Sequence, residues 1–197
     1  MSVTNGYASL ADVKAALRIT DTVDDALLEI SIEAASREID GWCERVFYST
    51  NATRVYRPDV DNVVQIDDLR SVTTLKTDTN GDGTYNQTWA TTDFELSPLN
   101  GLVGGVETPF YAVRATGDYA FNNGSYSEAS VQIVGVWGYA TVPTAVKQAC
   151  ILMSLRGFKR YDSPTGVMGF GDMIAHVGRV DPDVMKLLAP FKRMLTA

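Results

Sequence analysis

The stretch TDTVDDALLEISIEAASREIDGWCERVF, residues 20–47, decides what the first part of the fold must be. Its apolar residues recur at steps of three and four, the spacing that places side chains on one face of an α-helix. This apolar face comprises Leu28, Ile32, Ala35, Ile39, Trp42 and Val46. The charged residues are expected on the opposite, solvated face: Glu29, Glu33, Arg37, Asp40 and Glu44. The pattern predicts a long amphipathic helix over residues 22–45.

Two signals mark where helices begin. Ser9 is followed three residues later by Asp12, an approximate capping box at the start of SLADVKAALRI, residues 9–19. Thr22 and Asp25 have the same spacing at the start of the long helix, where acidic residues also suit the helix dipole. We therefore expect a short helix followed by a long one.

Residues 48–140 have a different pattern, because β-branched and aromatic residues are frequent there and turn-forming residues separate the apolar runs. The runs are NVVQIDDL (62–69), SVTTLKT (71–77), TYNQTWATTDFELSP (84–98), FYAVRAT (110–116) and ASVQIVGVWGYA (129–140). They predict five or six short strands. The last run carries little charge, so the strand containing Val131, Ile133 and Val136 is expected in the middle of the sheet.

The pattern returns to helix after residue 140. Pro143 is expected in the first turn of a helix over residues 143–161, where its missing amide does no harm. Apolar residues lie nearly all round this helix, which predicts burial on several sides. One of its stripes comprises Val146, Ala149, Cys150 and Met153. A Gly-rich loop over residues 163–180 then precedes a last helix, with Asp181 as its cap and Pro182 as its first residue.

These zones predict an α+β fold in which both chain ends contribute to one helical domain. The helical domain is expected to comprise residues 1–47 and 141–197. An inserted domain, an antiparallel β-sheet or sandwich, is expected over residues 48–140. The chain ends must meet because each long helix needs a partner for its apolar face.

The loop KTDTNGDGTYNQTW, residues 76–89, contains the first half of a calcium-loop pattern in Asp78, Asn80 and Asp82. The twelfth residue counted from Asp78 is Trp89, where an EF-hand requires a bidentate Glu. Asn-Gly and Asp-Gly pairs are also strong signals for a hairpin turn. A hairpin tip is the main prediction, and a calcium site formed by those three side chains is the alternative.

No catalytic or cofactor motif is found, so the sequence predicts neither an enzyme nor a cofactor. Cys43 and Cys150 lie in apolar helical patterns and are expected to be reduced core thiols. His176, the single histidine, is expected in a solvated loop, which argues against metal and Ser-His-Asp chemistry. No apolar run approaches about 20 residues and no signal-peptide pattern is found, so synthesis in a cytoplasm is expected.

Charge is distributed unevenly along the chain, whose formal net charge is −7. Residues 1–70 carry net −6, residues 71–140 net −5 and residues 141–197 net +4. An acidic chain does not favour tight duplex-DNA binding, since phosphate neutralisation drives that binding. The basic residues of the last part include Arg156, Lys159, Arg160, Arg179, Lys192 and Arg193. They suit either an acidic partner protein or an acidic surface of the same or a neighbouring subunit.

Three stretches together resemble the head–tail connector, or adaptor, proteins of tailed bacteriophages. They are YASLADVKAALRITDTVDDALLEISIEAASREIDGWCERVF (7–47), VGVWGYATVPTAVKQACILMSLRGFKRYDSPTGVMGF (134–170) and DPDVMKLLAPFKR (181–193). The order and spacing of these stretches carry the resemblance rather than any single motif. The central β zone resembles the β insertion of the longer connectors in this family.

The resemblance implies a structural protein of the virion neck, made in the bacterial host cytoplasm. Such connectors bind beneath the portal protein, typically as a ring of about twelve subunits. They prolong a DNA channel through which DNA passes without specific binding, and they dock the next neck or tail protein. No membrane contact is implied. A prophage or gene transfer agent would use the same pattern. A calcium-dependent binding or adhesion module that uses residues 78–83 is the alternative function.

Candidate partner-interface residues are the large apolar and basic side chains near the ends of the later helices and in the Gly-rich loop. They are Phe158, Lys159, Arg160, Met168, Phe170, Met173, Phe191, Lys192 and Arg193.

Overall fold

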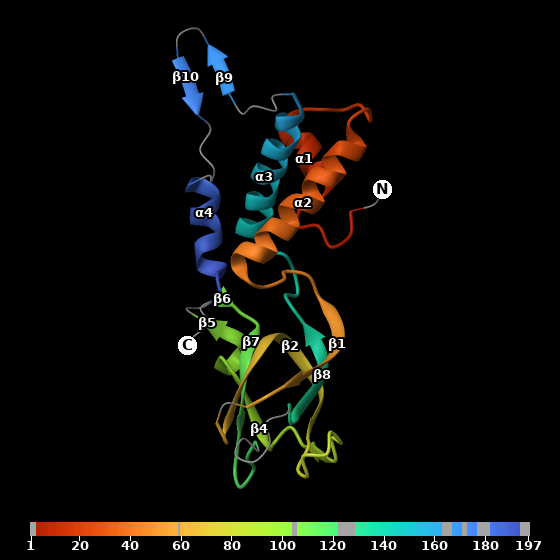
Figure 1. The fold of residues 1–197 in the computed structure, drawn as a ribbon, viewed down its shortest axis with the longest axis vertical. Coiled ribbons are helices and arrows are strands. Elements are labelled where there is room, and N and C mark those ends of the chain that lie inside the picture. Colours follow the sequence, from red (N-terminus) through yellow and green to blue (C-terminus); the bar gives the residue numbers. More distant parts are fainter. Residues whose placement is uncertain are drawn as a thin grey trace. The chain divides into compact units, whose positions relative to one another are not determined.

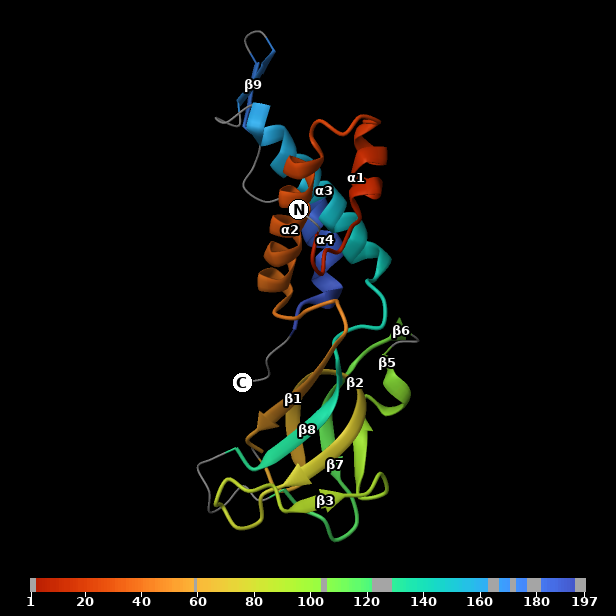
Figure 2. The same ribbon diagram turned by 90° about the vertical axis from the view of Figure 1, so that its right-hand side faces the viewer.

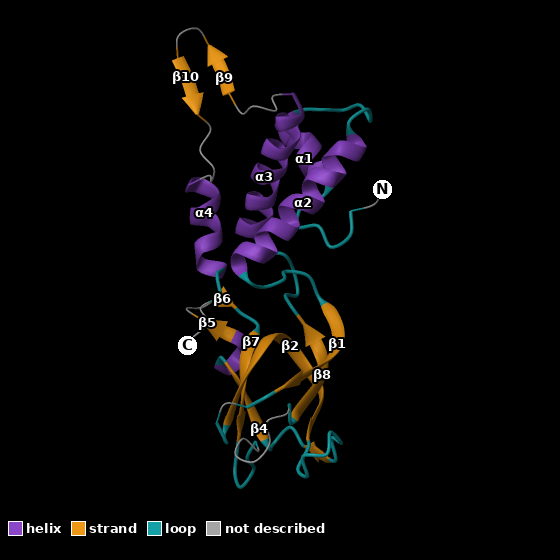
Figure 3. Ribbon diagram, in the orientation of Figure 1, coloured by secondary structure: helices purple, strands orange, loops and turns teal. Residues whose placement is uncertain are grey.

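The computed structural model describes residues 3–58, 60–103, 106–121, 129–162, 167–170, 173–176 and 182–193. Contacts between Cα atoms group the chain into two units, which we call the helical unit (residues 1–47 and 142–197) and the β unit (residues 48–141). The two units separate helices from the main sheet (Figures 1 and 3). The predicted α+β class is confirmed, with helices from both chain ends and an antiparallel sheet from the residues between them.

Helix α1, Leu10–Leu17, begins as the sequence predicts. The Ser9 hydroxyl accepts the Asp12 amide at 3.1 Å, and the Asp12 carboxylate accepts the Ser9 amide at 3.0 Å. The predicted capping box is therefore confirmed. Arg18 ends the helix in the left-handed conformation, with a φ of 60°.

Helix α2, Asp25–Cys43, is shorter than the predicted helix over residues 22–45. The predicted capping box of Thr22 and Asp25 is wrong, because Asp24 is the N-cap residue and its side chain makes no capping hydrogen bond. The Asp25 carboxylate lies 2.6 Å from Lys14 Nζ, next to α1 rather than to its own helix start. Asp25 therefore forms an ion pair with another helix instead of capping its own helix.

The apolar stripe of α2 is buried along most of its length. Its buried members are Leu28, Ser31, Ile32, Ala35, Ser36, Ile39 and Cys43. Trp42 was expected in this stripe, but 38% of its surface is exposed. Val46 lies beyond the helix, because Glu44 ends it with a left-handed φ of 54°. The stripe therefore ends at Cys43, four residues after Ile39.

Helix α3, Thr144–Asp162, packs antiparallel against α2. The Cys150 Sγ lies 3.5 Å from the Ser36 Oγ, and a Cβ built on Gly157 would lie 3.6 Å from the Ser31 Oγ. Small residues therefore let the two helices approach closely. The Ser36 hydroxyl donates to the carbonyl four residues earlier at 2.7 Å, so its burial leaves no unsatisfied donor.

The predicted stripe of α3 is partly confirmed. Val146, Ala149 and Cys150 are buried, but Ser154 occupies the next buried position in place of Met153. Three further apolar residues are only half-buried, so the predicted burial on several sides is incomplete within the unit: Ile151, Leu152 and Leu155. Cys43 and Cys150 are buried free thiols as predicted, and burial raises the pKa of the Cys43 thiol to about 11.

Helix α4, Pro182–Leu188, continues into the 3-10 turn η2, Ala189–Phe191. Pro182 opens α4 as predicted, and the predicted cap Asp181 lies outside the described residues. Strands β9, Val167–Phe170, and β10, Met173–His176, form an antiparallel pair inside the predicted Gly-rich loop. The loop prediction, including that for His176, is therefore wrong there, because β-forming apolar residues flank Gly171 and Asp172. In the described chain, no helix combines the length and apolar character needed to cross a membrane.

The β unit contains eight strands and one 3-10 turn in its described part. They are β1 (Thr50–Tyr56), β2 (Val63–Thr77), β3 (Gln87–Trp89), β4 (Phe94–Ser97), η1 (Leu99–Gly101), β5 (Leu102–Val103), β6 (Val106–Glu107), β7 (Phe110–Ala115) and β8 (Val131–Trp137).

The main sheet has the order β1-β8-β2-β7-β4, with β3 paired to β2. All of its pairs are antiparallel (Figure 2). Strand β8 lies between β1 and β2, so the predicted interior position is confirmed. Strand β2 is one strand of 15 residues where two were predicted, and register shifts follow Gln65, Leu69 and Val72. Strand β1 was not predicted, because none of its residues is fully buried and its apolar signal is weak.

The core of the β unit is built around aromatic side chains. The rings of Trp89 and Phe121 stack with centroids 4.7 Å apart. Trp137 is fully buried, and its indole nitrogen donates to the Ala52 carbonyl at 2.8 Å. After β8, Gly138 takes a φ of 87°, and a Cβ there would lie 2.0 Å from the Tyr48 carbonyl oxygen. Glycine is required at position 138 because the backbone there has a positive φ and lies against the backbone of Tyr48.

Candidate functional site

The C-terminal end of α2 gathers residues from three distant parts of the helical unit. The Phe47 ring lies edge-on to Tyr7, with centroids 5.5 Å apart, and edge-on to Phe191, with centroids 5.7 Å apart. Phe47 itself is fully buried. This aromatic cluster joins the N-terminal segment, the residues after α2 and the C-terminal segment.

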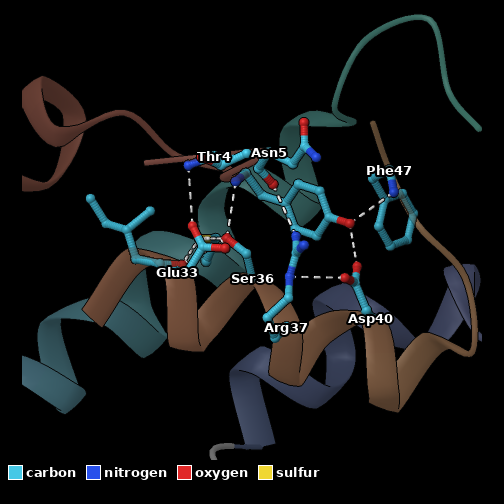
Figure 4. Close-up of polar contacts among 10 residues, drawn as sticks. Thr4, Asn5, Glu33, Ser36, Arg37, Asp40 and Phe47 are labelled. Atoms are coloured by element: carbon cyan, nitrogen blue, oxygen red, sulfur yellow. Dashed lines mark hydrogen bonds and ion pairs between the residues drawn. The ribbon is translucent and has the colours of Figure 1, made fainter. Parts of the chain in front are cut away.

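Polar contacts tie the same cluster to α2. The Tyr7 hydroxyl donates to the Asp40 carboxylate and accepts the Phe47 amide at 2.9 Å. The Arg37 Nε lies 3.1 Å from Asp40, and the Arg37 guanidinium also donates to the Asn5 carbonyl at 3.0 Å (Figure 4). Burial and the hydrogen bond to Asp40 raise the pKa of Tyr7, so its hydroxyl stays protonated and donates. Burial also raises the pKa of Asp40, against the opposing effects of the Tyr7 hydrogen bond and Arg37.

The N-terminal segment runs along α2 through backbone contacts. The Tyr7 amide donates to the Ser36 hydroxyl at 3.1 Å, and the Thr4 amide donates to the Glu33 carboxylate at 3.3 Å (Figure 4). These contacts are separated by one turn of α2, so the segment is fixed along the helix. Two charged residues that were expected on the solvated face, Glu33 and Asp40, serve this attachment.

The C-terminal segment packs across the end of α2. The Arg193 amide donates to the Cys43 carbonyl at 3.0 Å, which satisfies one of the last carbonyls of the helix. The Lys192 ammonium lies 4.9 Å from the centroid of the Trp42 ring, a cation–π arrangement. Of the predicted interface residues, Phe191 and Arg193 are half-buried here and Lys192 is exposed.

The other described candidates lie at the opposite end of α2. Because α2 and α3 run antiparallel, Phe158, Lys159 and Arg160 in the last turns of α3 lie toward the start of α2. Phe158 is half-buried, whereas Lys159 and Arg160 are exposed. The structure therefore does not bring the two sets of candidates into one site.

Three further candidates lie in the β9–β10 pair. Met168 and Phe170 belong to β9, and Met173 belongs to β10, where it pairs with Phe170. Their side chains lie outside the described residues, so only their strand positions are known.

Helix α2 also has an exposed apolar face, which the predicted division into apolar and charged faces does not include. Leu27 and Ile30 are 37% and 47% exposed, and Ala34 and Gly41 on the same side are also exposed. The face opposite the buried stripe was expected to be charged. The signal was present in the sequence, since these residues follow one another at steps of three, four and seven.

The loop over residues 78–83 joins β2 to β3, so the predicted hairpin is confirmed. The Asp78 carboxylate accepts the amides of Asn80, Gly81 and Gly83 at 2.9, 2.8 and 2.7 Å. Burial would raise the pKa of Asp78, but these amides outweigh it and lower the pKa. The Asp82 carboxylate accepts the Thr84 amide at 2.8 Å. Each carboxylate thus satisfies backbone amides of its own turn.

A metal site in the described part of the chain would require several ligating side chains that lie close together. No group of three or more His, Cys, Asp or Glu side chains among those residues is arranged to hold a metal ion. The features that the fold does present are surfaces: the exposed face of α2, the basic end of α3 and the attached C-terminal segment.

The fold of the whole chain is similar to that of proteins in solved structures. A protein in the neck of an empty gene transfer agent (GTA) particle computed with C6 symmetry matches with a TM-score of 0.61 at 16% identity, over 100% of this chain and 95% of that one. A protein in the neck of a native GTA particle computed with C12 symmetry matches with a TM-score of 0.60 at 17% identity, over 100% and 94%. A chain of the native GTA virion matches with a TM-score of 0.55 at 18% identity, over 100% and 95%.

A family model described as phage gp6-like head-tail connector protein matches residues 7–77. No curated protein matches the sequence. The family match covers α1, α2 and the first two strands, and it confirms the resemblance found in the sequence. The family is one of connector proteins, which agrees with the prediction of a structural protein rather than an enzyme.

Proposed function

We propose that this chain, which carries the head–tail connector family match over residues 7–77, is a structural connector in the neck of a tailed phage, prophage or gene transfer agent particle. The observation that carries the proposal is the coincidence of this match with a neck-protein fold along the whole chain. The family match and the fold match come from independent comparisons, and both support a place in the neck of the particle.

The connector forms a ring beneath the portal protein. The matched neck structures were computed with sixfold and twelvefold symmetry, which supports a cyclic assembly of about twelve copies. A ring of this kind uses two different surfaces of each subunit, because every copy contacts one neighbour on each side. The helical unit offers several surfaces that differ in charge and apolar character.

The ring extends the DNA channel and docks the next neck or tail protein. The formal net charge of −7 supports a lumen that repels the phosphate backbone, so that DNA slides without sticking. The basic side chains near the ends of α3 and α4 suit an acidic protein partner on the portal or tail side. The candidates for those contacts remain Phe158, Lys159, Arg160, Met168, Phe170, Met173, Phe191, Lys192 and Arg193.

The proposal is tested by measuring the mass of the purified full-length protein by light scattering over a concentration series, with negative-stain images of any large species. A ring of about twelve 21.5 kDa chains has a mass of roughly 260 kDa. The expected result is such a ring, formed alone or after addition of a cognate portal ring. A protein that stays monomeric in both conditions and does not bind the portal contradicts the proposal.

The lumen is tested separately with a duplex-DNA binding measurement at low and high salt. We expect no tight binding at either salt concentration, because the chain lacks the positive charge that phosphate neutralisation requires. Tight binding that weakens steeply as salt is raised would contradict the sliding channel while leaving the connector role in place.

A further inference from the structure

Helix α2 is apolar on two opposite faces. One face is buried against the rest of the helical unit and includes Leu28, Ile32, Ala35 and Ile39. The other comprises Leu27, Ile30, Ala34 and Gly41, and all four are exposed. At 100° per residue these two sets lie on nearly opposite sides of the helix. We call the exposed set the outer face of α2.

The outer face is suited to close contact with another protein surface. Its first half presents the large side chains of Leu27 and Ile30. Its second half presents the small Ala34 and the bare backbone of Gly41, bordered by the exposed Arg37 and Glu38. A Cβ built on Gly41 would meet no atom within 4 Å, so the space above it is open. Large residues beside small ones allow a partner element to approach the helix closely.

Exposed apolar side chains are concentrated near this face. Large exposed apolar residues in the described helical unit are Val23, Leu27, Ile30, Trp42 and Tyr161. Val23, at 85% exposure, lies two residues before the first residue of α2. Trp42 differs from them because Lys192 lies over its ring.

Charge indicates what covers the outer face. Exposed acidic residues near it are Asp21, Glu38 and Glu44. The exposed Arg37 also lies beside it, but its guanidinium is paired with Asp40 at 3.1 Å. The exposed charged residues described on α3 and α4 are mostly basic, namely Arg156, Lys159, Arg160 and Lys186, with Asp183 as the acidic exception. Helix α3 contacts both α2 and α4, which lie on either side of it in Figure 1. One chain thus carries two complementary surfaces that face in different directions.

We propose that the outer face of α2 docks a second copy of this chain through the basic α3–α4 side of that copy. Such a contact is heterologous, since the two surfaces differ, and repetition around an axis closes a ring. This inference rests on the proposed connector function, because it names the contact that would hold the connector ring together. Apolar burial at Leu27 and Ile30 supplies the attraction, and the charges set the orientation.

The first experiment compares ring formation by the full-length native chain and two variants. Ile30→Glu places a charge on the outer face, and Leu102→Glu makes the same kind of change at a residue of the β unit that is 50% exposed. We expect Ile30→Glu to raise the concentration for half-assembly at least tenfold, and Leu102→Glu to leave it unchanged. Circular dichroism checks that both variants are folded.

The second experiment exploits the two-sided nature of the contact. Ile30→Glu lacks a working outer face, and the double variant Lys159→Glu/Arg160→Glu lacks a working basic side. Neither is expected to form rings alone. An equimolar mixture is expected to form dimers and nothing larger, because one contact can be made between the two variants and no further copy can be added.

The outcomes separate this inference from the function on which it rests. A native ring that survives Ile30→Glu, or a mixture that gives no dimers, overturns the inference and leaves the connector proposal intact. If the native chain forms no ring, a photo-crosslinking residue at position 30 is used at high concentration, alone and with the portal ring. A crosslink to α3 or α4 of a second copy supports the inference. Two results overturn it: a crosslink to the α2 of a second copy, and the absence of any crosslink to a second copy, including the case in which crosslinks form only within one chain.

Discussion

The Lys147 ammonium lies 2.8 Å from the Asp12 carboxylate, which joins the first turn of α3 to the first turn of α1. The same carboxylate closes the capping box with Ser9. One acidic side chain therefore caps a local helix and connects segments from the two ends of the chain. The capping box stabilises α1 alone, whereas the ion pair stabilises the packing of α3 against α1.

Asp12→Asn is expected to lower the free energy of unfolding at pH 7 and to make that free energy less sensitive to acid. Hydrogen bonds from Lys147 and Ser9 lower the pKa of Asp12 to about 2, below its value in an unfolded chain. The stabilisation is therefore complete above about pH 4 and is lost as pH falls toward 2. Because the side chains of Lys147 and Asp12 are 43% and 30% exposed, solvent screening limits the expected loss at pH 7 to about 1 kcal/mol.

Urea unfolding followed by circular dichroism at pH 7 and pH 3 measures this effect. Glu38→Gln, a change at an exposed acidic residue of α2, serves as the control. The native protein and the control should lose stability between the two pH values by more than Asp12→Asn does. An equal loss in all three would show that Asp12 does not supply the acid sensitivity.

Tyr7→Phe is expected to lower the free energy of unfolding by about 1–3 kcal/mol, since it leaves the Phe47 amide and the Asp40 carboxylate without the Tyr7 hydroxyl. The ring itself and its contact with Phe47 are kept. The control is Tyr161→Phe, because Tyr161 is 54% exposed. Denaturant unfolding of the three proteins makes the comparison, and a Tyr7→Phe stability equal to that of the control would contradict the buried network.

Two glycine substitutions are expected to act in opposite directions. Gly138→Ala should destabilise the protein by roughly 2 kcal/mol or more, because φ is 87° there and the new Cβ would lie 2.0 Å from a backbone oxygen. Gly41→Ala should stabilise it by about 0.5–1 kcal/mol, because the position is helical and open. Thermal unfolding of both variants beside the native chain tests the pair. A stabilising Gly138→Ala would show that the backbone relaxes freely at that point.

The segment of residues 48–141 is expected to fold when produced alone, in line with the predicted inserted β domain. Its two ends already lie together, since Thr50 of β1 pairs with Trp137 of β8. Its aromatic core is formed entirely by its own residues. A cooperative thermal transition and a β-type circular dichroism spectrum are the expected results. A fragment that is unfolded under native conditions would mean that the insertion depends on the helical unit.

Asp78→Ala is expected to lower the melting temperature of the native chain more than Asp82→Ala does. The Asp78 carboxylate accepts three backbone amides of the hairpin, whereas Asp82 accepts one. The lowered pKa of Asp78 means that its contribution is present above the unfolded pKa and is lost as pH falls through the folded pKa. Saturating calcium is expected to leave the native melting temperature unchanged. A calcium-dependent rise that Asp82→Ala abolishes would instead support the calcium module.

Local patterns predicted much of the secondary structure. The Ser9–Asp12 capping box, the buried residues from Leu28 to Ile39 and the hairpin after β2 were all predicted correctly, because each depends on residues close in sequence. The Thr22–Asp25 box failed because Asp25 pairs with Lys14 of another helix. Strand β1 was missed because an edge strand with no fully buried residue carries a weak pattern.

The candidate surfaces were harder to predict. Composition indicated Lys159, Arg160 and Lys192 as partner contacts. The antiparallel packing of α2 and α3 places the first two near one end of α2 and Lys192 at the other. The side of α2 opposite the buried stripe was expected to be charged and solvated, whereas Glu33 and Asp40 hold the N-terminal segment and Leu27 and Ile30 are exposed. A helical repeat identifies which residues share a face, but not which face the rest of the protein covers.

The α+β class, the order of helical and β zones and the resemblance to connector proteins follow from the sequence alone, because they depend on local periodicity and on the order of motifs along the chain. The meeting of Tyr7, Phe47 and Phe191 at one end of α2, and the exposure of Leu27 and Ile30, became visible only once the helices were packed together. The physical reason is that contacts between distant segments are selected by packing of the whole unit, which no local pattern contains.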